Sequence, residues 1–243
     1  MPVFPLETTN GSALPAESAR ATGASSIDGA AVLPYPRELE RWVDWQGTRV
    51  LLRPIRPDDA EAHLRFVRAL APDDVRYRMF MAMRELPPDK LARLTRIDYD
   101  REMAFIATRP VSSMPRDKDT PGDGKPAPRG PRTGPLTVPE ADGNLLWETL
   151  GVARVVRDAT RNEAEFAIIV RSDLKGHGLG NILMQHLIAY CRTRGIGAIV
   201  GESLSDNAAL RRLVRRLGFT IDAYGEAGTR GLRLALSGGG GTG

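Results

Sequence analysis

Cysteine is nearly absent from this sequence of 243 residues, which contains only Cys191. A single cysteine cannot form an internal disulfide or supply the paired thiolates of a zinc cluster. Cys191 falls on the apolar side of a predicted helix, where a small buried side chain is the default interpretation. The three histidines, His63, His177 and His186, show no metal-ligand spacing. We therefore expect no bound metal.

Long apolar runs are also missing. No stretch of eighteen apolar residues is present, so the sequence predicts no helix that crosses a membrane. The N-terminus has no apolar segment behind a basic start, which is the pattern of a secretory signal. We expect a cytoplasmic protein with no membrane partner.

Aromatic residues make up only 6% of the chain, and lysine is scarce among its basic residues. The net charge is +4, and 30 of the 34 basic residues are arginines. Composition bias is the favoured interpretation of this excess, because a nucleic-acid surface would cluster basic residues with aromatic ones. No such cluster is present, so no nucleic-acid partner is expected.

The chain is long enough for one domain with a substantial core. Residues 1–36 are rich in Ala, Ser, Thr, Gly and Pro without periodicity, which predicts a disordered tail. The predicted domain spans residues 37–236. Within it, residues 109–144 hold many Pro and Gly and few large apolar side chains, which predicts a flexible insertion. Residues 237–243 form a Gly-rich tail.

The most informative stretch is AEFAIIVRSDLKGHGLG, residues 164–180. The part that ends at Val170 is apolar and β-branched, which predicts a buried strand. Three glycines follow within residues 175–180, and a helix is predicted from Leu179 to about Arg194. Glycines let a ligand approach backbone N–H groups closely, and the positive end of a helix dipole attracts anions. The stretch therefore predicts an anion site that suits a pyrophosphate.

Two familiar phosphate motifs do not match these glycines. The P-loop requires Lys-Ser or Lys-Thr after the last glycine, and neither is present. The dinucleotide fingerprint requires G-x-G-x-x-G in an early βαβ unit, whereas Gly176, Gly178 and Gly180 alternate with other residues late in the chain.

The remaining pattern predicts alternating strands and helices. Strands are expected at residues 48–53, 103–108, 145–156 (kinked near Gly151), 198–203, 219–222 and 231–236. Helices are expected at residues 60–70, at 72–81, after Pro87-Pro88, and from an N-cap at Asp206 or Asn207 to Gly218. This order indicates an α/β fold (α+β mixed sheet) with helices on both faces of the sheet.

The glycine pattern resembles the [Q/R]-x-x-G-x-[G/A] loop of the GNAT N-acetyltransferase superfamily, which binds the pyrophosphate of acyl-CoA. Its three positions are occupied by Lys175, Gly178 and Gly180. The Asn-Ala-Ala at residues 207–209 is similar to a later family motif in which an Asn contacts the CoA arm. The resemblance covers about residues 49–236 and implies a single GNAT-like acyl-CoA N-acyltransferase domain.

A narrower resemblance is to the acetyltransferase domain of bacterial Pat-type protein-lysine acetyltransferases. It rests on LRPIRPDD, RYRMF, GVARVV, LGF and, most specifically, RIDYDREMAF at residues 96–105. It implies acetyl-CoA as co-substrate and protein lysines as acceptors, with acyl-CoA synthetases among the expected partners.

Acyl transfer to an amine needs a base, because a free lysine with a pKa of ~10.4 is protonated at neutral pH. The resemblance assigns this role to Glu165, for which an edge salt bridge is the competing interpretation, and Glu202 is the reserve base. It also implies backbone N–H donors on the central strand and contacts to acyl-CoA along the loop. The implied binding residues are Ile168, Ile169, Val170, Lys175, Gly176, His177, Gly178, Leu179, Gly180 and Asn207.

One family position departs from the pattern. Many GNAT enzymes carry a tyrosine there that protonates the leaving thiolate, and this sequence has Val214. We assign no general acid, since a thiol with a pKa of ~8.5 leaves readily as a thiolate. The basic band of Arg211, Arg212, Arg215 and Arg216 is either a solvated face or a contact for CoA phosphate or an acidic protein substrate.

Two alternatives to protein-lysine acetylation stay open. The first is an N-acetyltransferase of a small amine, for which Asp98, Asp100 and Glu102 would line an acidic pocket. The second is a non-catalytic CoA-sensing module, against which the presence of Glu165 argues.

Overall fold

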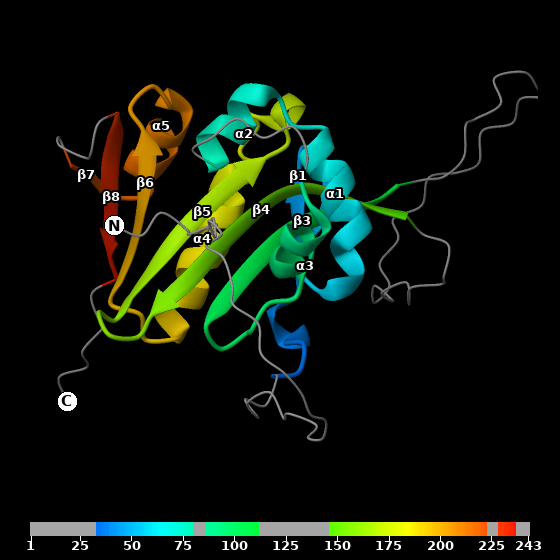
Figure 1. The fold of residues 1–243 in the computed structure, drawn as a ribbon, viewed down its shortest axis with the longest axis horizontal. Helices are drawn as coiled ribbons and strands as arrows, with labels where there is room; N and C mark the ends of the chain where they lie inside the picture. Colours follow the sequence, from blue (N-terminus) through cyan, green and yellow to red (C-terminus); the bar gives the residue numbers. More distant parts are fainter. Residues whose placement is uncertain (1–32, 80–85, 112–145, 223–227, 237–243) are drawn as a thin grey trace, which may run out of the picture. The chain divides into compact units, whose positions relative to one another are not determined.

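The computed structural model describes residues 33–79, 86–111, 146–222 and 228–236 (Figure 1). The predicted tails and insertion lie almost wholly outside these residues. The insertion was predicted to begin too early, because Arg109 to Val111 continue a strand that pairs with its neighbour.

In the described part of the chain, eight strands form one mixed sheet in the order β1-β2-β3-β4-β5-β6-β8-β7. Neighbouring strands are antiparallel, except that β5 and β6 are parallel because a helical crossover joins them. The strands are β1 (Arg41–Trp45), β2 (Thr48–Pro54), β3 (Glu102–Val111), β4 (Leu146–Asp158), β5 (Glu163–Val170), β6 (Ala198–Leu204), β7 (Thr220–Ile221) and β8 (Thr229–Ala235).

Helices cover both faces of the sheet, as the sequence predicts. The helices are α1 (Ala60–Arg68), α2 (Pro72–Met79), α3 (Pro88–Thr95), α4 (Leu179–Thr193) and α5 (Ala208–Arg216), with short 3₁₀ turns η1 (Arg37–Leu39), η2 (Pro57–Asp59) and η3 (Ser172–Leu174). Strand β3 illustrates how both faces are covered, because its successive side chains point alternately into the hydrophobic clusters on the two faces of the sheet. Met103 and Phe105 pack in the cluster that includes α4, and Ala104 and Ile106 pack with Phe66 of α1. In Figure 1, α4 lies behind the sheet and α1 and α3 lie in front of it.

The kink predicted near Gly151 is a β-bulge in β4. Ala107 pairs with Gly151 and Thr108 with Thr149, so Leu150 has no partner opposite it in β3. Gly151 lies directly under α4, where an added Cβ would be 2.9 Å from Leu183 Cδ1. A residue without a side chain lets α4 approach the sheet at this point.

Strand β1 was not predicted. It forms a hairpin with β2, and the two residues of the turn, Gln46 and Gly47, have φ angles of 51° and 70°. Positive φ at both central positions is the type I′ geometry that joins antiparallel strands tightly. The Gln-Gly pair between two β-rich segments was the available signal.

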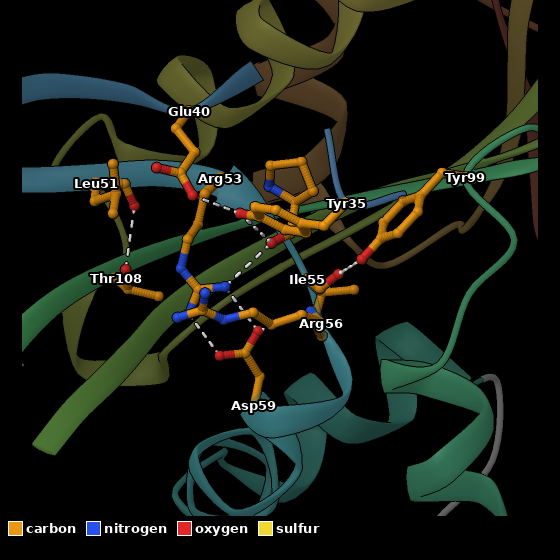
Figure 2. Close-up of polar contacts among 10 residues, drawn as sticks. Tyr35, Glu40, Leu51, Arg53, Ile55, Arg56, Asp59, Tyr99 and Thr108 are labelled. Carbon is orange, nitrogen blue, oxygen red and sulfur yellow. Dashed lines mark hydrogen bonds and ion pairs between the residues drawn. The ribbon is translucent and has the colours of Figure 1, made fainter. Parts of the chain in front are cut away.

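A buried ion pair fixes the corner between β2 and α1 (Figure 2). The Arg53 guanidinium donates two hydrogen bonds to the Asp59 carboxylate, at 2.8 and 2.5 Å, and both residues are buried. The Tyr99 hydroxyl donates to the Ile55 carbonyl at 2.7 Å, and the Tyr35 hydroxyl lies 3.4 Å from the Pro54 carbonyl oxygen at the end of β2. These contacts attach the segment before β1 and the loop before β3 to the same corner.

Candidate active site

The sheet opens between its two parallel strands. Pairing of β5 with β6 covers only residues Glu163 to Glu165, opposite Ala198 to Val200. Beyond Glu165 the two strands separate, while β5 stays paired with β4 up to Val170. The edge of β5 that faces β6 is therefore open over its last five residues.

The register with β4 determines which amides face this opening. The Arg171 N–H donates to the Leu150 carbonyl at 2.9 Å, so Val170 and Gly151 form a non-hydrogen-bonded pair. Because pairs alternate along antiparallel strands, the N–H groups of Ile168 and Val170 point away from β4 and into the opening. The N–H of Ile169 points toward β4. The strand thus directs two of the three expected amides to the opening.

A cavity of about 470 Å³ occupies this opening. Its walls come from the open edge of β5, the glycine loop, the first turn of α4, α5 and the end of α2. Nine of the ten sequence-predicted binding residues line it: Ile168, Ile169, Val170, Lys175, Gly176, Gly178, Leu179, Gly180 and Asn207.

The glycine loop carries the backbone geometry that its sequence requires. Gly176 and Gly178 have φ angles of 81° and 88°, in the left-handed region that side chains disfavour. Gly178 is the N-cap of α4, and its carbonyl accepts the Asn181 N–H at 3.0 Å. No acidic residue lies in the first turn of α4. Within the described residues the N–H groups of Leu179 and Gly180 have no backbone acceptor, so the helix end can receive an anion.

Lys175 lines the cavity, and its ammonium group forms an ion pair with the Asp74 carboxylate of α2. From its place in the loop motif, Lys175 was expected to bind acyl-CoA, and the sequence named no partner for its charge. The structure shows that this charge is paired, and Asp74 gave no sequence signal for such a role.

His177 lies in the loop but does not line the cavity. Its side chain is exposed, and its carbonyl accepts the Trp45 Nε1–H at 2.8 Å. The contribution of His177 in this structure is therefore a backbone anchor between the loop and β1.

Glu165 is half-buried on β5, at the point where β6 begins to separate. It lies three residues before Ile168, about 10 Å along the strand, and does not itself line the cavity. Burial and the nearby Glu202 carboxylate raise the pKa of Glu165 to about 7, against a smaller lowering by the Arg78 guanidinium. A carboxyl group with this pKa exchanges protons near neutral pH.

Glu202 is exposed and lies on the same face as Glu165. Val200 is opposite Glu165 in the parallel pair, and Glu202 follows two residues later along β6. Glu163, two residues before Glu165, instead accepts a hydrogen bond from Arg233 at 2.7 Å.

Arg78 and Tyr77 of α2 also line the cavity, and neither was predicted from the sequence. Arg78 is half-buried, and burial together with the Arg154 charge lowers its pKa to about 10, while the Glu165 and Glu102 carboxylates oppose this shift. Their only sequence signal was the RYRMF block. Arg78 thus lines the cavity and also acts electrostatically on the Glu165 carboxylate.

The last helix separates its four arginines between two sides. Arg212 and Arg216 line the cavity together with Asn207, whose side-chain oxygen caps α5 by accepting the Leu210 N–H at 3.0 Å. Arg211 and Arg215 line a different depression. One pair of arginines is therefore placed for an anion in the cavity.

Val214 is fully buried in the core, so its side chain is not part of the cavity. Among the described residues, no group of three His, Cys, Asp or Glu side chains could hold a metal ion. None of the helices described is both long enough and apolar enough to cross a membrane.

Known proteins with a GNAT domain are similar to this chain in sequence and in fold. Residues 131–219 match the family model of the Acetyltransferase (GNAT) family. The crystal structure of the GNAT domain of S. lividans PAT superposes with a TM-score of 0.63 over 83% of this chain and 99% of that chain, at 23% identity. This likeness confirms the predicted α/β fold.

Three curated relatives differ in their names. Acetyltransferase PA5475 of Pseudomonas aeruginosa is 28% identical over 82% of this chain and 91% of its own length. Acetyltransferase Pat of Mycolicibacterium smegmatis is 26% identical over 78% of this chain, which spans 45% of that protein. An L-methionine sulfoximine/L-methionine sulfone acetyltransferase of Pseudomonas paraeruginosa is 44% identical over 35% of this chain and 50% of its own length.

Proposed function

We propose that this chain, which carries a GNAT acetyltransferase domain, is an enzyme that moves the acetyl group of acetyl-CoA to the ε-amine of a protein lysine. We place this activity in the cytoplasm. Glu165 is its general base. The observation that carries the proposal is a half-buried carboxyl group with a pKa of about 7 at the point where β5 leaves β6.

The open edge of β5 supports the acyl-transfer step. The Ile168 and Val170 N–H groups point into the opening, where they are placed to stabilise the oxyanion of a tetrahedral intermediate. The unsatisfied first turn of α4, with Arg212 and Arg216 beside it, suits the phosphate groups of CoA.

The proton balance of the reaction assigns one task to Glu165. The acceptor arrives as an ammonium ion, and the Glu165 carboxylate takes one proton from it, directly or through water. The free amine attacks the thioester carbonyl, the new C–N bond forms and the C–S bond breaks. The thiolate leaves as CoA, and the second amine proton passes to it or to water.

The similarity to Pat supports a protein-lysine acceptor, and acyl-CoA synthetases are the proposed targets. The similarity to a methionine sulfoximine acetyltransferase favours a second candidate, a small amine. The acidic residues expected to hold such an amine are themselves paired. Arg154 pairs with Glu102, and Arg194 pairs with Asp100 at 2.8 Å. This pairing favours the protein acceptor.

CoA release from acetyl-CoA tests the proposal, with an acyl-CoA synthetase and L-methionine sulfoximine as alternative acceptors. Glu165→Gln is expected to lower kcat by about 100-fold, the usual contribution of a general base. Glu163→Gln is the matched control, because Glu163 lies on the same face of β5 but pairs with Arg233.

Each result has one meaning. Turnover with the synthetase that falls in Glu165→Gln but not in Glu163→Gln supports the proposal. Turnover with methionine sulfoximine alone supports the small-amine candidate. Acetyl-CoA binding without turnover of any acceptor supports the non-catalytic CoA-sensing module, and unchanged turnover in Glu165→Gln excludes Glu165 as the base.

A further inference from the structure

Asp74 is a buried carboxylate that contacts the glycine loop from another element. It lies in the first turn of α2 with 7% of its surface exposed. One of its oxygens accepts a hydrogen bond from the Ser172 hydroxyl at 2.5 Å, and the other pairs with the Lys175 ammonium. The Ser172 hydroxyl in turn accepts the Ala71 N–H at 2.8 Å.

These partners account for the burial of a charge. A carboxylate removed from water needs hydrogen bonds or an opposite charge, and Asp74 has both. Both come from residues 172–175, the segment that enters the glycine loop just before Gly176. The path of the loop is therefore set by α2, about one hundred residues earlier in the chain.

A second contact joins α2 to the opposite wall of the cavity. Arg76 donates to the Asp206 carboxylate at 2.7 Å, and Asp206 immediately precedes the N-cap of α5. Helix α2 thus contacts the segments before both α4 and α5, and both segments line the cavity. Figure 1 shows α2 near the end of β5.

We propose that Asp74 is a positioning residue of the acyl-CoA site, which holds the glycine loop in its anion-binding conformation before the diphosphate of CoA arrives. The inference rests on the proposed use of acetyl-CoA. A loop that is already ordered loses less conformational entropy when the ligand binds, so its affinity for the diphosphate is higher.

Asp74 also has an effect that opposes binding of the diphosphate. Asp74 is negative, and it shares Lys175 with the incoming diphosphate. The Lys175 side chain is 41% exposed and carries three donors, so it can contact Asp74 and a phosphate oxygen together. Ordering of the loop is therefore expected to outweigh competition for Lys175.

Calorimetric binding of two ligands tests the proposal. CoA carries the diphosphate and the adenosine nucleotide, and pantetheine is the same thiol arm without either. Asp74→Ala and Ser172→Ala are expected to weaken CoA binding by about tenfold, or about 1.4 kcal/mol, and to leave pantetheine binding unchanged. Asp74→Asn keeps an oxygen for the Ser172 hydroxyl, so a smaller loss is expected.

Asp73→Asn is the matched control. Asp73 is the neighbouring residue on α2, its side chain is 80% exposed, and its nearest cation is Arg76 at 3.8 Å. It is expected to bind CoA as the wild type does.

Two results would overturn the proposal. If Asp74→Ala binds CoA as tightly as the wild type or more tightly, Asp74 only competes for Lys175. If CoA and pantetheine weaken equally, Asp74 only stabilises the fold. Failure of the wild type to bind CoA at all would instead refute the proposed function, because no acceptor is needed for this measurement.

Discussion

At the scale of single residues, the proposed chemistry depends on a carboxyl group, that of Glu165, whose pKa is shifted by its surroundings. The charged groups that act on Glu165 come from two other elements, β6 with Glu202 and α2 with Arg78. Burial is the largest influence on the pKa and Glu202 the second, while Arg78 opposes both. A base that is half protonated near neutral pH is suited to both taking up and releasing a proton.

The pH dependence of kcat/KM follows from this shift. The proposed base Glu165 can take a proton only when it is ionised, so with a pKa of about 7 the rate should fall about tenfold per pH unit below pH 7. Glu202→Gln removes a like charge, which lowers the pKa of Glu165, so the acid limb of the profile should move to lower pH. Glu165 stays half-buried in this variant. Its pKa, and with it the acid limb, should therefore remain above that of an exposed glutamate.

The control for this profile is Glu163→Gln, which changes a carboxylate already paired with Arg233. Its acid limb should coincide with that of the wild type. An acid limb that stays in place in Glu202→Gln would show that the two carboxylates do not interact during catalysis.

At the scale of elements, the position of α4 matters most, because its first turn supplies the proposed anion site. The close packing of α4 on the sheet depends on Gly151, because the buried Leu183 of α4 occupies the space next to it. Side chains from both strands of the β4–β5 pair pack against the same helix face, so a shift of α4 would also move the loop that precedes it.

Gly151→Ala tests this packing. The new Cβ would lie 2.9 Å from Leu183 Cδ1 and 3.2 Å from the Ile169 carbonyl oxygen, and the backbone oxygen cannot move aside. We expect a loss of about 1–3 kcal/mol in the free energy of unfolding, the usual cost of overpacking, measured by urea denaturation. Gly180→Ala is the control for stability, since its Cβ would meet Leu213 at an ordinary 3.5 Å. Equal stabilities of the two variants would contradict the packing argument.

At the scale of the whole molecule, buried polar contacts join segments that are distant in sequence. The Arg53–Asp59 pair holds the corner between β2 and α1, and the Asp74 contacts join α2 to the glycine loop. The first supports the core on one face of the sheet, and the second supports the site at its edge.

Arg53→Met tests the contribution of the buried pair. It leaves the Asp59 carboxylate buried without its partner, which should cost roughly 3–5 kcal/mol of stability and lower Tm by roughly 10 °C. Circular dichroism during heating measures this change. The control is Arg65→Met, which breaks the exposed Arg65–Glu61 pair and should change stability by less than about 1 kcal/mol. A double variant, Arg53→Met with Asp59→Leu, should recover much of the loss, and no recovery would contradict the interpretation.

The sequence by itself determined the fold class, the glycine loop and most of the secondary structure. These features depend on local chemistry: alternation in β3, helical spacing in α4, and positive φ angles at Gly176 and Gly178. The same local rules apply to β1, because its Gln-Gly turn has positive φ at both residues.

Only the tertiary structure decided which charges meet. Asp74 and Lys175 are 101 residues apart, and Glu165 and Glu202 lie on different strands, so neither sequence spacing nor periodicity relates them. The resemblance implied backbone N–H donors on the central strand, but which of its amides face the opening followed from the register of β5 with β4. Register and long-range ion pairs arise when elements pack, and packing depends on the whole chain rather than on any one stretch of it.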